Sequence, residues 1–149
     1  MSTNLIQTQA RIRGVNLGHW LVLERWMEKS EGPGIFANAV ADDERTLRHE
    51  LDEQTLQERL AEHRGSYVTR DSLLWLADTG CNLVRVPVPY HAYGDEKHES
   101  CIDYVDDVMA WAAECNMPVL LDLHTVPGGQ NGFDNSGQSG LCTWHLEST

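Results

Sequence analysis

The sequence has few basic residues and no long apolar run, and each shortage excludes a class of protein. Lysine and arginine number 11 against 23 aspartates and glutamates, so the formal net charge of the 149-residue chain is −12. So acidic a surface repels phosphate groups, and we expect neither nucleic acid nor a membrane as a partner. The longest apolar runs, such as residues 73–77, are far too short to cross a bilayer.

Cysteine is also scarce, and its spacing follows no disulfide pattern. The four cysteines are Cys81, Cys101, Cys115 and Cys142. The first 13 residues are polar and lack the apolar core of a secretory signal. Hydrophobic residues make up 41% of the chain and alternate with charges, which is typical of folded proteins. We therefore expect one globular domain over residues 1–149, located in the cytoplasm, with secretion left open.

Three stretches resemble buried strands, at residues 11–17, 82–88 and 117–124. The last two are almost continuously apolar, which favours parallel strands covered on both faces. Gly14 interrupts the first, so its pattern is the weakest. The order of strands and helices predicts an α/β fold built on a parallel sheet.

Helical patterns lie between these strands. Residues 70–79 follow Thr69, a favoured N-cap residue, and Gly80 stands where helices commonly end. Residues 101–116 carry one apolar stripe, and the charge-rich residues 43–64 suggest two short surface helices ending near Gly65. No further helix pattern follows the third strand. We therefore expect part of a larger fold, with self-association through the open sheet edge.

Polar residues with chemical potential stand on or after the strands. Arg85 interrupts an apolar strand, so it either orients a catalytic or substrate carboxylate or forms a structural ion pair. Asp122 and His124 point to one face of the third strand, and His124 is the better site candidate. A metal site would use both with Cys142 and His145, but a third ligand at a recognisable spacing is lacking, so we expect no metal.

The glycine-rich residues 127–137 lack the Lys-Ser/Thr ending of a phosphate loop. Their asparagine, glutamine and aspartate side chains suit the hydroxyl groups of sugars. Four aromatic residues fall in or beside loops and either stack on sugar faces or plug the end of the fold: Trp20, Trp26, Phe133 and Trp144. Trp75 and Trp111 fall within helices, and we expect them in the core.

Three motifs together resemble glycoside hydrolase family 5, and within it the exo-β-1,3-glucanase-like branch. They are R-G-V-N-L-G-H-W-L-V-L-E at 13–24, V-R-V-P-V-P-Y at 84–90, and D-L-H-T-V-P-G-G-Q-N-G-F-D-N-S-G at 122–137. The resemblance implies that the chain forms the first three β/α units of a (β/α)8 TIM barrel. It also implies hydrolysis of β-1,3-glucan or β-glucoside bonds with retention of configuration, in polysaccharide catabolism, without a cofactor.

The resemblance further implies roles for five residues. Arg85 matches the arginine that orients the nucleophilic glutamate, and His124 matches a histidine lining the subsite of the cleaved sugar. Glu24 matches a glutamate that binds hydroxyls of that terminal glucose. Asn135 matches an asparagine near the same subsite, and Phe133 an aromatic residue that contacts the neighbouring sugar.

The chain departs from the family in one major respect. Retaining hydrolysis needs two carboxylates about 5–5.5 Å apart, and in this family they are glutamates after strands four and seven, the first in an Asn-Glu pair. No Asn-Glu pair occurs here. We therefore expect both catalytic groups beyond Thr149, an inactive 149-residue chain, and an Arg85 that lacks its carboxylate partner. The alternative is a non-catalytic truncated remnant or a sugar-binding half-barrel.

Overall fold

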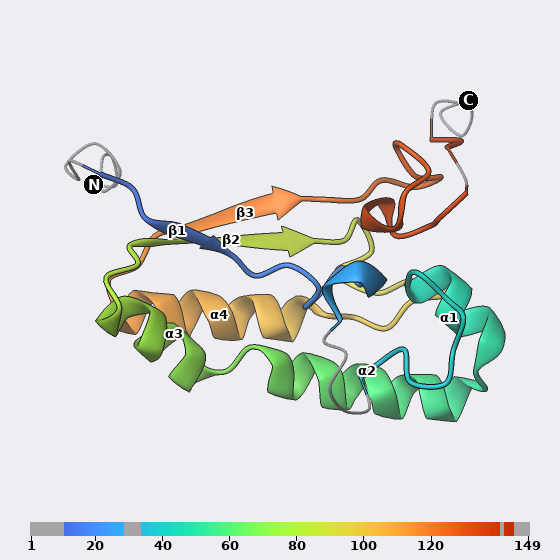
Figure 1. Ribbon diagram of the computed structural model, residues 1–149, viewed down its shortest axis with the longest axis horizontal. Coiled ribbons are helices and arrows are strands. Elements are labelled where there is room, and N and C mark those ends of the chain that lie inside the picture. Colours follow the sequence, from blue (N-terminus) through green and yellow to red (C-terminus); the bar gives the residue numbers. More distant parts are fainter. Residues whose placement is uncertain (1–10, 29–33, 141, 145–149) are drawn as a thin grey trace.

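The computed structural model describes residues 11–28, 34–140 and 142–144, and a three-stranded parallel sheet forms its centre (Figure 1). The strands are β1 (Gly14–Asn16), β2 (Leu83–Val88) and β3 (Val119–Leu123), with β2 in the middle. In the register, Asn16 lies opposite Arg85 and Pro87 lies opposite Asp122. All three predicted strands are confirmed, each shorter than the pattern suggested, and their carboxyl ends meet at the same end of the sheet.

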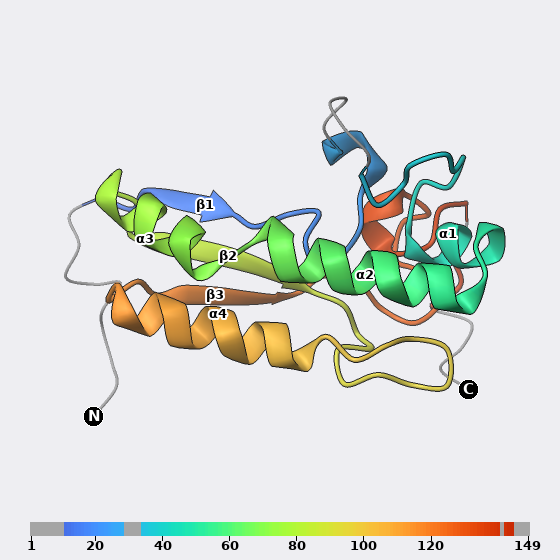
Figure 2. The same cartoon turned by 90° about the horizontal axis from the view of Figure 1, so that it is seen from below.

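The helices cover one face of this sheet (Figure 2). Three of them lie between β1 and β2, namely α1 (Glu44–Glu50), α2 (Glu53–Tyr67) and α3 (Arg70–Asp78). The fourth, α4 (Ile102–Glu114), connects β2 to β3. Two short 3-10 turns, η1 (Arg25–Met27) and η2 (Asp134–Ser136), lie in the loops after β1 and β3. This confirms the α/β class, with parallel strands inside and helices outside.

Local capping chemistry explains where two helices begin. The Thr69 hydroxyl accepts a hydrogen bond from the Ser72 amide, and the Ser72 hydroxyl accepts one from the Thr69 amide, which confirms the predicted N-cap of α3. Asp43 caps α1 in the same way, with its Oδ1 accepting from the Thr46 amide at 2.7 Å. After α3, Gly80 has a φ of +89°, a conformation that glycine adopts without strain.

The prediction of two surface helices at residues 43–64 is confirmed, and the structure adds the core that they cover. Helix α2 continues through Gly65 to Tyr67, and both helices bury leucines. Leu47, Leu56 and Leu60 form a second hydrophobic core with Phe36 and neighbouring residues of the segment before α1. That segment covers the leucine face of the two helices, and the opposite face of α2 is exposed, as expected of surface helices.

Gly65 is a position where the fold can be stabilised. It is exposed within α2, and a Cβ atom added there meets no atom within 4 Å. We expect Gly65→Ala to raise the free energy of unfolding by about 0.5–1 kcal/mol, because glycine in a helix loses more backbone entropy on folding than alanine. Urea denaturation measures this. Gly80→Ala is the control, and it should destabilise because φ is positive there. A destabilised Gly65→Ala variant would contradict the helical placement of Gly65.

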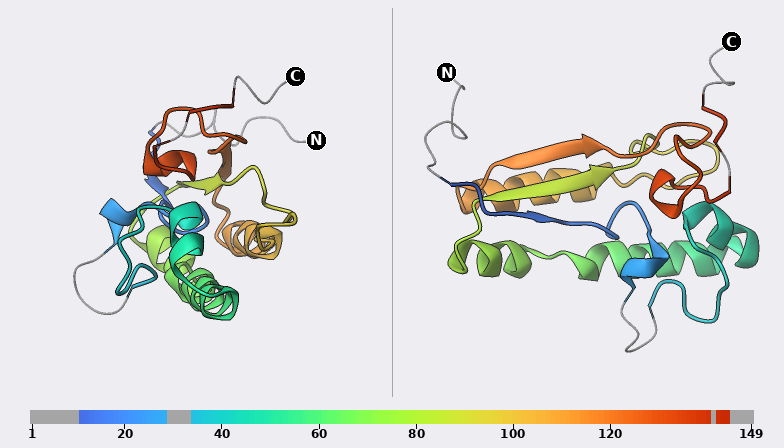
Figure 3. Two further views of the ribbon diagram at one scale, coloured as in Figure 1. Left: turned by 90° about the vertical axis from the view of Figure 1, so that its right-hand side faces the viewer. Right: turned by 45° about the horizontal axis from the view of Figure 1, so that its top comes forward.

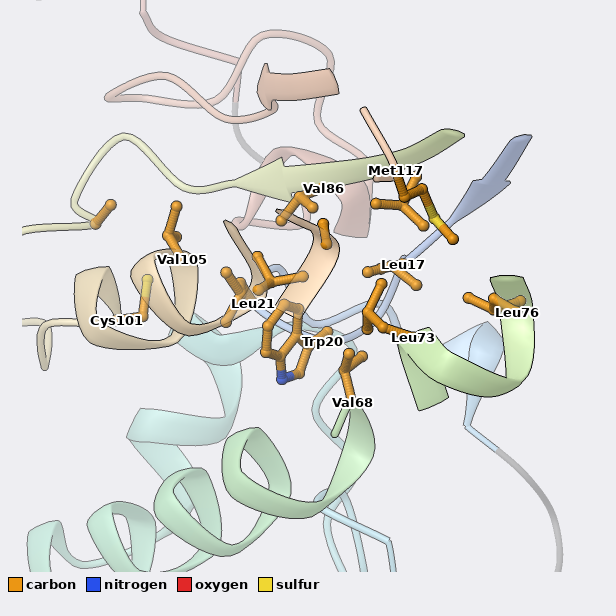
Figure 4. Close-up of a cluster of buried hydrophobic side chains, with 14 residues drawn as sticks. Leu17, Trp20, Leu21, Val68, Leu73, Leu76, Val86, Cys101, Val105 and Met117 are labelled. Atoms are coloured by element: carbon orange, nitrogen blue, oxygen red, sulfur yellow. The ribbon is translucent and has the colours of Figure 1, made fainter. Parts of the chain in front are cut away.

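The main core fills the space between the sheet and the helices (Figure 4). Val84 and Val86 of β2 are fully buried in it, so the intervening Arg85 points to the opposite face of the sheet. Trp20 is also fully buried, and its Nε1 donates a hydrogen bond to the Arg64 carbonyl oxygen at 2.8 Å. Trp20 is therefore a core residue, as the plug interpretation allowed, and is excluded from sugar stacking.

Trp75 was expected in the core, and this prediction is wrong. Its side chain is 65% exposed, whereas Leu73 and Leu76 on the same helix are buried. A position within a helix does not by itself decide whether a side chain faces the core. Leu73 and Leu76 face the core, whereas Trp75, which lies between them in the sequence, is on the exposed side of the helix. Trp111 on α4 packs against the core as expected.

The edge strand β3 carries apolar residues that remain exposed. Leu120, Leu121 and Leu123 of β3 are 50–70% exposed, and no α-helix follows β3 among the described residues up to Trp144.

None of the helices in the described part of the chain combines the length and apolarity that crossing a membrane requires.

Candidate functional site

A cluster of three polar side chains lies on the sheet face opposite the helices. Arg85 Nη2 donates to Asp122 Oδ2 at 2.6 Å, and His124 Nδ1 lies 2.6 Å from the same oxygen. The Arg85 nitrogen and the His124 nitrogen are themselves 3.2 Å apart. Arg85 Nη1 also donates to Asn16 Oδ1 at 2.8 Å. Residues from all three strands thus meet here, because their carboxyl ends are in register.

The expectation that Arg85 lacks a carboxylate partner within this chain is wrong. Asp122, two residues before His124 on the neighbouring strand, supplies that carboxylate. The ion-pair interpretation of Arg85 is therefore confirmed within the chain. The Arg85 side chain is still 35% exposed, so its guanidinium has room to meet a second carboxylate.

Asp122 also orients His124. When Nδ1 of His124 donates its proton to Asp122, the other ring nitrogen, Nε2, is left as a hydrogen-bond acceptor. The His124 backbone is fixed as well, because its amide donates to the Val88 carbonyl and its carbonyl accepts from Gln130 Nε2 at 2.8 Å. The result is an imidazole held by a carboxylate, suited to accepting a hydrogen bond from a hydroxyl group.

The loop after β3 presents Phe133 and Asn135. Phe133 is 68% exposed at the start of the η2 turn. Asn135 Oδ1 accepts a hydrogen bond from Asn131 Nδ2 at 3.0 Å, so the two amides are ordered relative to each other. The carboxylate of Asp43, which caps α1, accepts a further hydrogen bond from the Ser139 amide. An aromatic face and amide groups are therefore displayed on a loop anchored to α1.

Glu24 stands in the loop after β1 and is largely buried. Its Oε2 accepts a hydrogen bond from Trp26 Nε1 at 3.0 Å, and its amide donates to His19 Nδ1 at 3.1 Å. His19 adopts a φ of +62° to make that turn. In the described part of the chain, Glu24 makes no hydrogen bond with Arg85, Asp122 or His124, so the structure holds it in place by separate contacts.

The sequence predicts neither the contact of Asn16 with Arg85 nor the bond between Asp122 and Arg85. Asp122 is a site candidate because it shares a strand face with His124, but its bond to Arg85 crosses between strands. Asn16 ends the first strand, and only the register places it beside Arg85. The position of each at a strand end was the one indication available.

The metal interpretation requires Asp122 and His124 to lie close to further ligands such as Cys142 or His145. No group of three or more histidine, cysteine, aspartate or glutamate side chains suited to a metal is found among the described residues. His145 lies outside the described residues. The cysteines Cys81, Cys101, Cys115 and Cys142 are free thiols.

The fold and the strand-end cluster define the class of protein: the chain forms the first three strands of a (β/α)8 barrel and the helices that connect them, with its polar side chains at the carboxyl ends of the strands. Residues 52–143 match cellulase, glycosyl hydrolase family 5. The chain belongs to that family.

Several curated fungal proteins are similar to the chain. "Probable glucan 1,3-beta-glucosidase A" of Aspergillus fumigatus is 40% identical over 144 residues, which cover 93% of this chain and 34% of that protein. The protein of the same name from Aspergillus clavatus is 41% identical over 143 residues, with the same coverage. "Glucan 1,3-beta-glucosidase" of Blumeria graminis is 36% identical and is covered over 32% of its length. The chain spans about a third of the length of these relatives.

Solved structures give a matching result. The crystal structure of rutinosidase from Aspergillus niger superimposes with a TM-score of 0.69 and 28% identity, covering 86% of this chain and 37% of that one. The crystal structure of AoRut gives a TM-score of 0.75 and 29% identity, covering 87% and 37%. The fold of these residues is therefore that of one part of larger enzymes.

Proposed function

We propose that these residues form the sugar-binding part of a retaining glycosidase that cleaves β-1,3-glucan or β-glucoside oligosaccharides in polysaccharide catabolism. The observation that carries the proposal is the Arg85–Asp122–His124 cluster at the carboxyl ends of the strands, where enzymes of this barrel class place their active sites. Membership of glycosyl hydrolase family 5 and the names of the relatives support it.

In this proposal each site residue has a distinct part. His124 Nε2 accepts a hydrogen bond from a hydroxyl of the sugar at the cleavage point, and Glu24 and Asn135 bind further hydroxyls of the same sugar. The exposed ring of Phe133 stacks on the neighbouring sugar. Arg85, held by Asp122, turns its remaining N–H groups to the nucleophilic glutamate and keeps that group ionised.

The proposal places both catalytic glutamates outside these 149 residues. Asp122 cannot replace the nucleophile, because its carboxylate is already committed to Arg85 and His124. The domain assignment is likewise a proposal: residues 1–149 form the amino-terminal part of one barrel domain. The 149-residue chain then binds sugar without hydrolysing it.

We expect isothermal titration of the chain with laminaribiose to show binding, and chromatography to show no glucose release. His124→Ala and Phe133→Ala should each weaken binding about tenfold, because each removes one hydrogen bond or one stacking contact worth roughly 1–1.5 kcal/mol. Tyr93→Ala is the matched control for Phe133→Ala, because Tyr93 is 82% exposed on a loop outside the cluster.

Two results would contradict this proposal. Equal affinities for the His124→Ala variant and the unmodified chain would remove the cluster from the binding site. Glucose release by the pure chain, abolished by Glu24→Gln, would show that a catalytic pair exists within these residues.

A second candidate is a non-catalytic sugar-binding half-barrel that pairs with another copy through the sheet edge. One observation favours it: Asp122 forms an ion pair with Arg85 within the chain, so the cluster forms without the nucleophilic glutamate. Exposed leucines on β3 suit such pairing. Analytical ultracentrifugation discriminates the two, since a stable dimer that binds laminaribiose would favour this candidate.

A further inference from the structure

Helix α1, the loop from β2 to α4 and the loop after β3 gather at the carboxyl end of the sheet (Figure 3). A basic cavity is lined by residues of these three segments. Its volume is about 420 Å³. The arginine, lysine and histidine residues that line it are Arg45, Arg48, His49, His91, Lys97 and His98. No aspartate or glutamate is among the described residues lining it, although acidic residues outnumber lysine and arginine 23 to 11 in the chain.

Several polar groups at this cavity lack a hydrogen-bond partner. In the described part of the chain, the half-buried Arg45 side chain and the ammonium of Lys97 make no hydrogen bond or ion pair. Arg48 Nε and His91 Nδ1 are buried without a hydrogen bond, and Arg48 Nη2 has only a long ion pair with Glu44 Oε1, at 3.6 Å. A buried polar group left without a partner destabilises the fold, so a ligand that supplied hydrogen-bond partners here would recover that free energy.

The nearby carboxylates pair with only some of the cavity residues. Glu53 accepts hydrogen bonds from Arg48 Nη1 at 3.2 Å, and Glu44 Oε1 lies 3.6 Å from Arg48 Nη2. Asp95 lies 2.8 Å from His98 Nδ1 and so holds the His98 ring, which stacks on His91 with centroids 3.8 Å apart. These contacts fix the wall of the cavity, and they leave the charges of Arg45 and Lys97 uncompensated.

We propose that this cavity binds a multiply charged oxyanion, such as the phosphate group of a small molecule. Arginine, lysine and histidine are the side chains that recognise such groups by charge-assisted hydrogen bonds. The cavity is larger than a bare phosphate needs, and Tyr90 and Pro127 line its remainder, so a phosphorylated sugar fits it. None of the lining residues belongs to the Arg85–Asp122–His124 cluster, so the proposal does not rest on the proposed function.

Isothermal titration of the chain with inorganic phosphate at pH 7.5 tests the proposal. We expect saturable binding that weakens about tenfold in Arg45→Gln and in Lys97→Gln, and disappears in the double variant. Arg70→Gln is the control, because Arg70 is an exposed arginine of α3 paired with Glu114 away from the cavity. In NMR spectra, phosphate should shift the ring signals of His91 and His98 and leave those of His19 and His63 unchanged.

Glucose 6-phosphate and glucuronate identify the source of the oxyanion. Tighter binding of the first indicates a phosphorylated sugar, equal binding of the second indicates a sugar acid, and both support an oxyanion site. The proposal is overturned if phosphate shows no saturable binding, or if Arg70→Gln weakens binding as much as Arg45→Gln does.

Discussion

Glu44→Gln should lower the free energy of unfolding by about 3–5 kcal/mol, because it leaves a buried guanidinium without its counter-charge. Arg64 Nη2 lies 2.9 Å from Glu44 Oε2, and the two side chains are only 2% and 7% exposed. The pair joins α2 to α1, and the Arg64 backbone carbonyl also accepts the hydrogen bond of Trp20. A loss of that size is a large part of the 5–15 kcal/mol by which domains are typically stable.

Urea denaturation of matched variants separates burial from charge as the cause. Glu114→Gln breaks a second arginine–glutamate pair, Arg70 with Glu114, but both side chains are about half exposed, so we expect a loss of at most about 1 kcal/mol. The double variant Glu44→Leu/Arg64→Met should recover most of the loss, because apolar groups need no counter-charge and Arg48, which also pairs with Glu44 at 3.6 Å, keeps its contact with Glu53. Equal effects for Glu44→Gln and Glu114→Gln would refute the argument.

This ion pair also bears on the candidate site. Helix α1, which carries Glu44, begins at Asp43, and the Asp43 carboxylate accepts the hydrogen bond of the Ser139 amide in the loop after β3. That loop presents Phe133 and Asn135. A loosened α1 is therefore expected to weaken sugar binding as well as stability.

The second large effect is a loss of stability in acid. Burial, assisted by the neighbouring His63, lowers the pKa of His19 from 6.5 to about 4. Between these two values the unfolded chain binds a proton that the folded chain does not, so stability falls as the pH drops from 6.5 to 4. We expect His19 alone to contribute roughly 3 kcal/mol to that fall, and no further loss below pH 4.

His19→Asn tests this assignment. Asparagine tolerates the positive φ of this position better than most residues, and its side-chain oxygen can accept the hydrogen bond from the Glu24 amide. The variant should lose the His19 share of the pH dependence, as measured by urea denaturation at pH 4.5 and 7. His49→Asn, at an exposed histidine, is the control and should keep it. An unchanged slope in His19→Asn would rule out His19 as the titrating group.

Strands and helices whose positions depend on neighbouring residues in the sequence could be predicted. The apolar runs located β2 and β3, and the N-cap at Thr69 placed the start of α3 correctly. Side-chain exposure was less predictable, because it depends on which face another segment covers. Trp75 is exposed and Trp20 is buried for this reason. Likewise, residues 35–41 pack on the leucines of two charge-rich helices and form a second core with them.

The candidate site divides in the same way. Arg85 and His124 could be chosen from the sequence, because a guanidinium in an apolar strand and a histidine at a strand end are chemically unusual where they stand. Their connection through Asp122 could not, because it depends on the register between β2 and β3, which hydrogen bonds set only when the sheet forms. The basic cavity could not be predicted from the sequence either, because its residues come from three separate segments.

The class, the family and the strand ends that carry polar chemistry follow from local patterns, because apolar periodicity, capping residues and motifs are properties of neighbouring residues. The partner of Arg85, the acid-sensitive burial of His19 and the gathering of positive charge around Arg45 and Lys97 follow only from packing. They depend on distances between residues far apart in the chain, and those distances exist only once the sheet and helices have assembled.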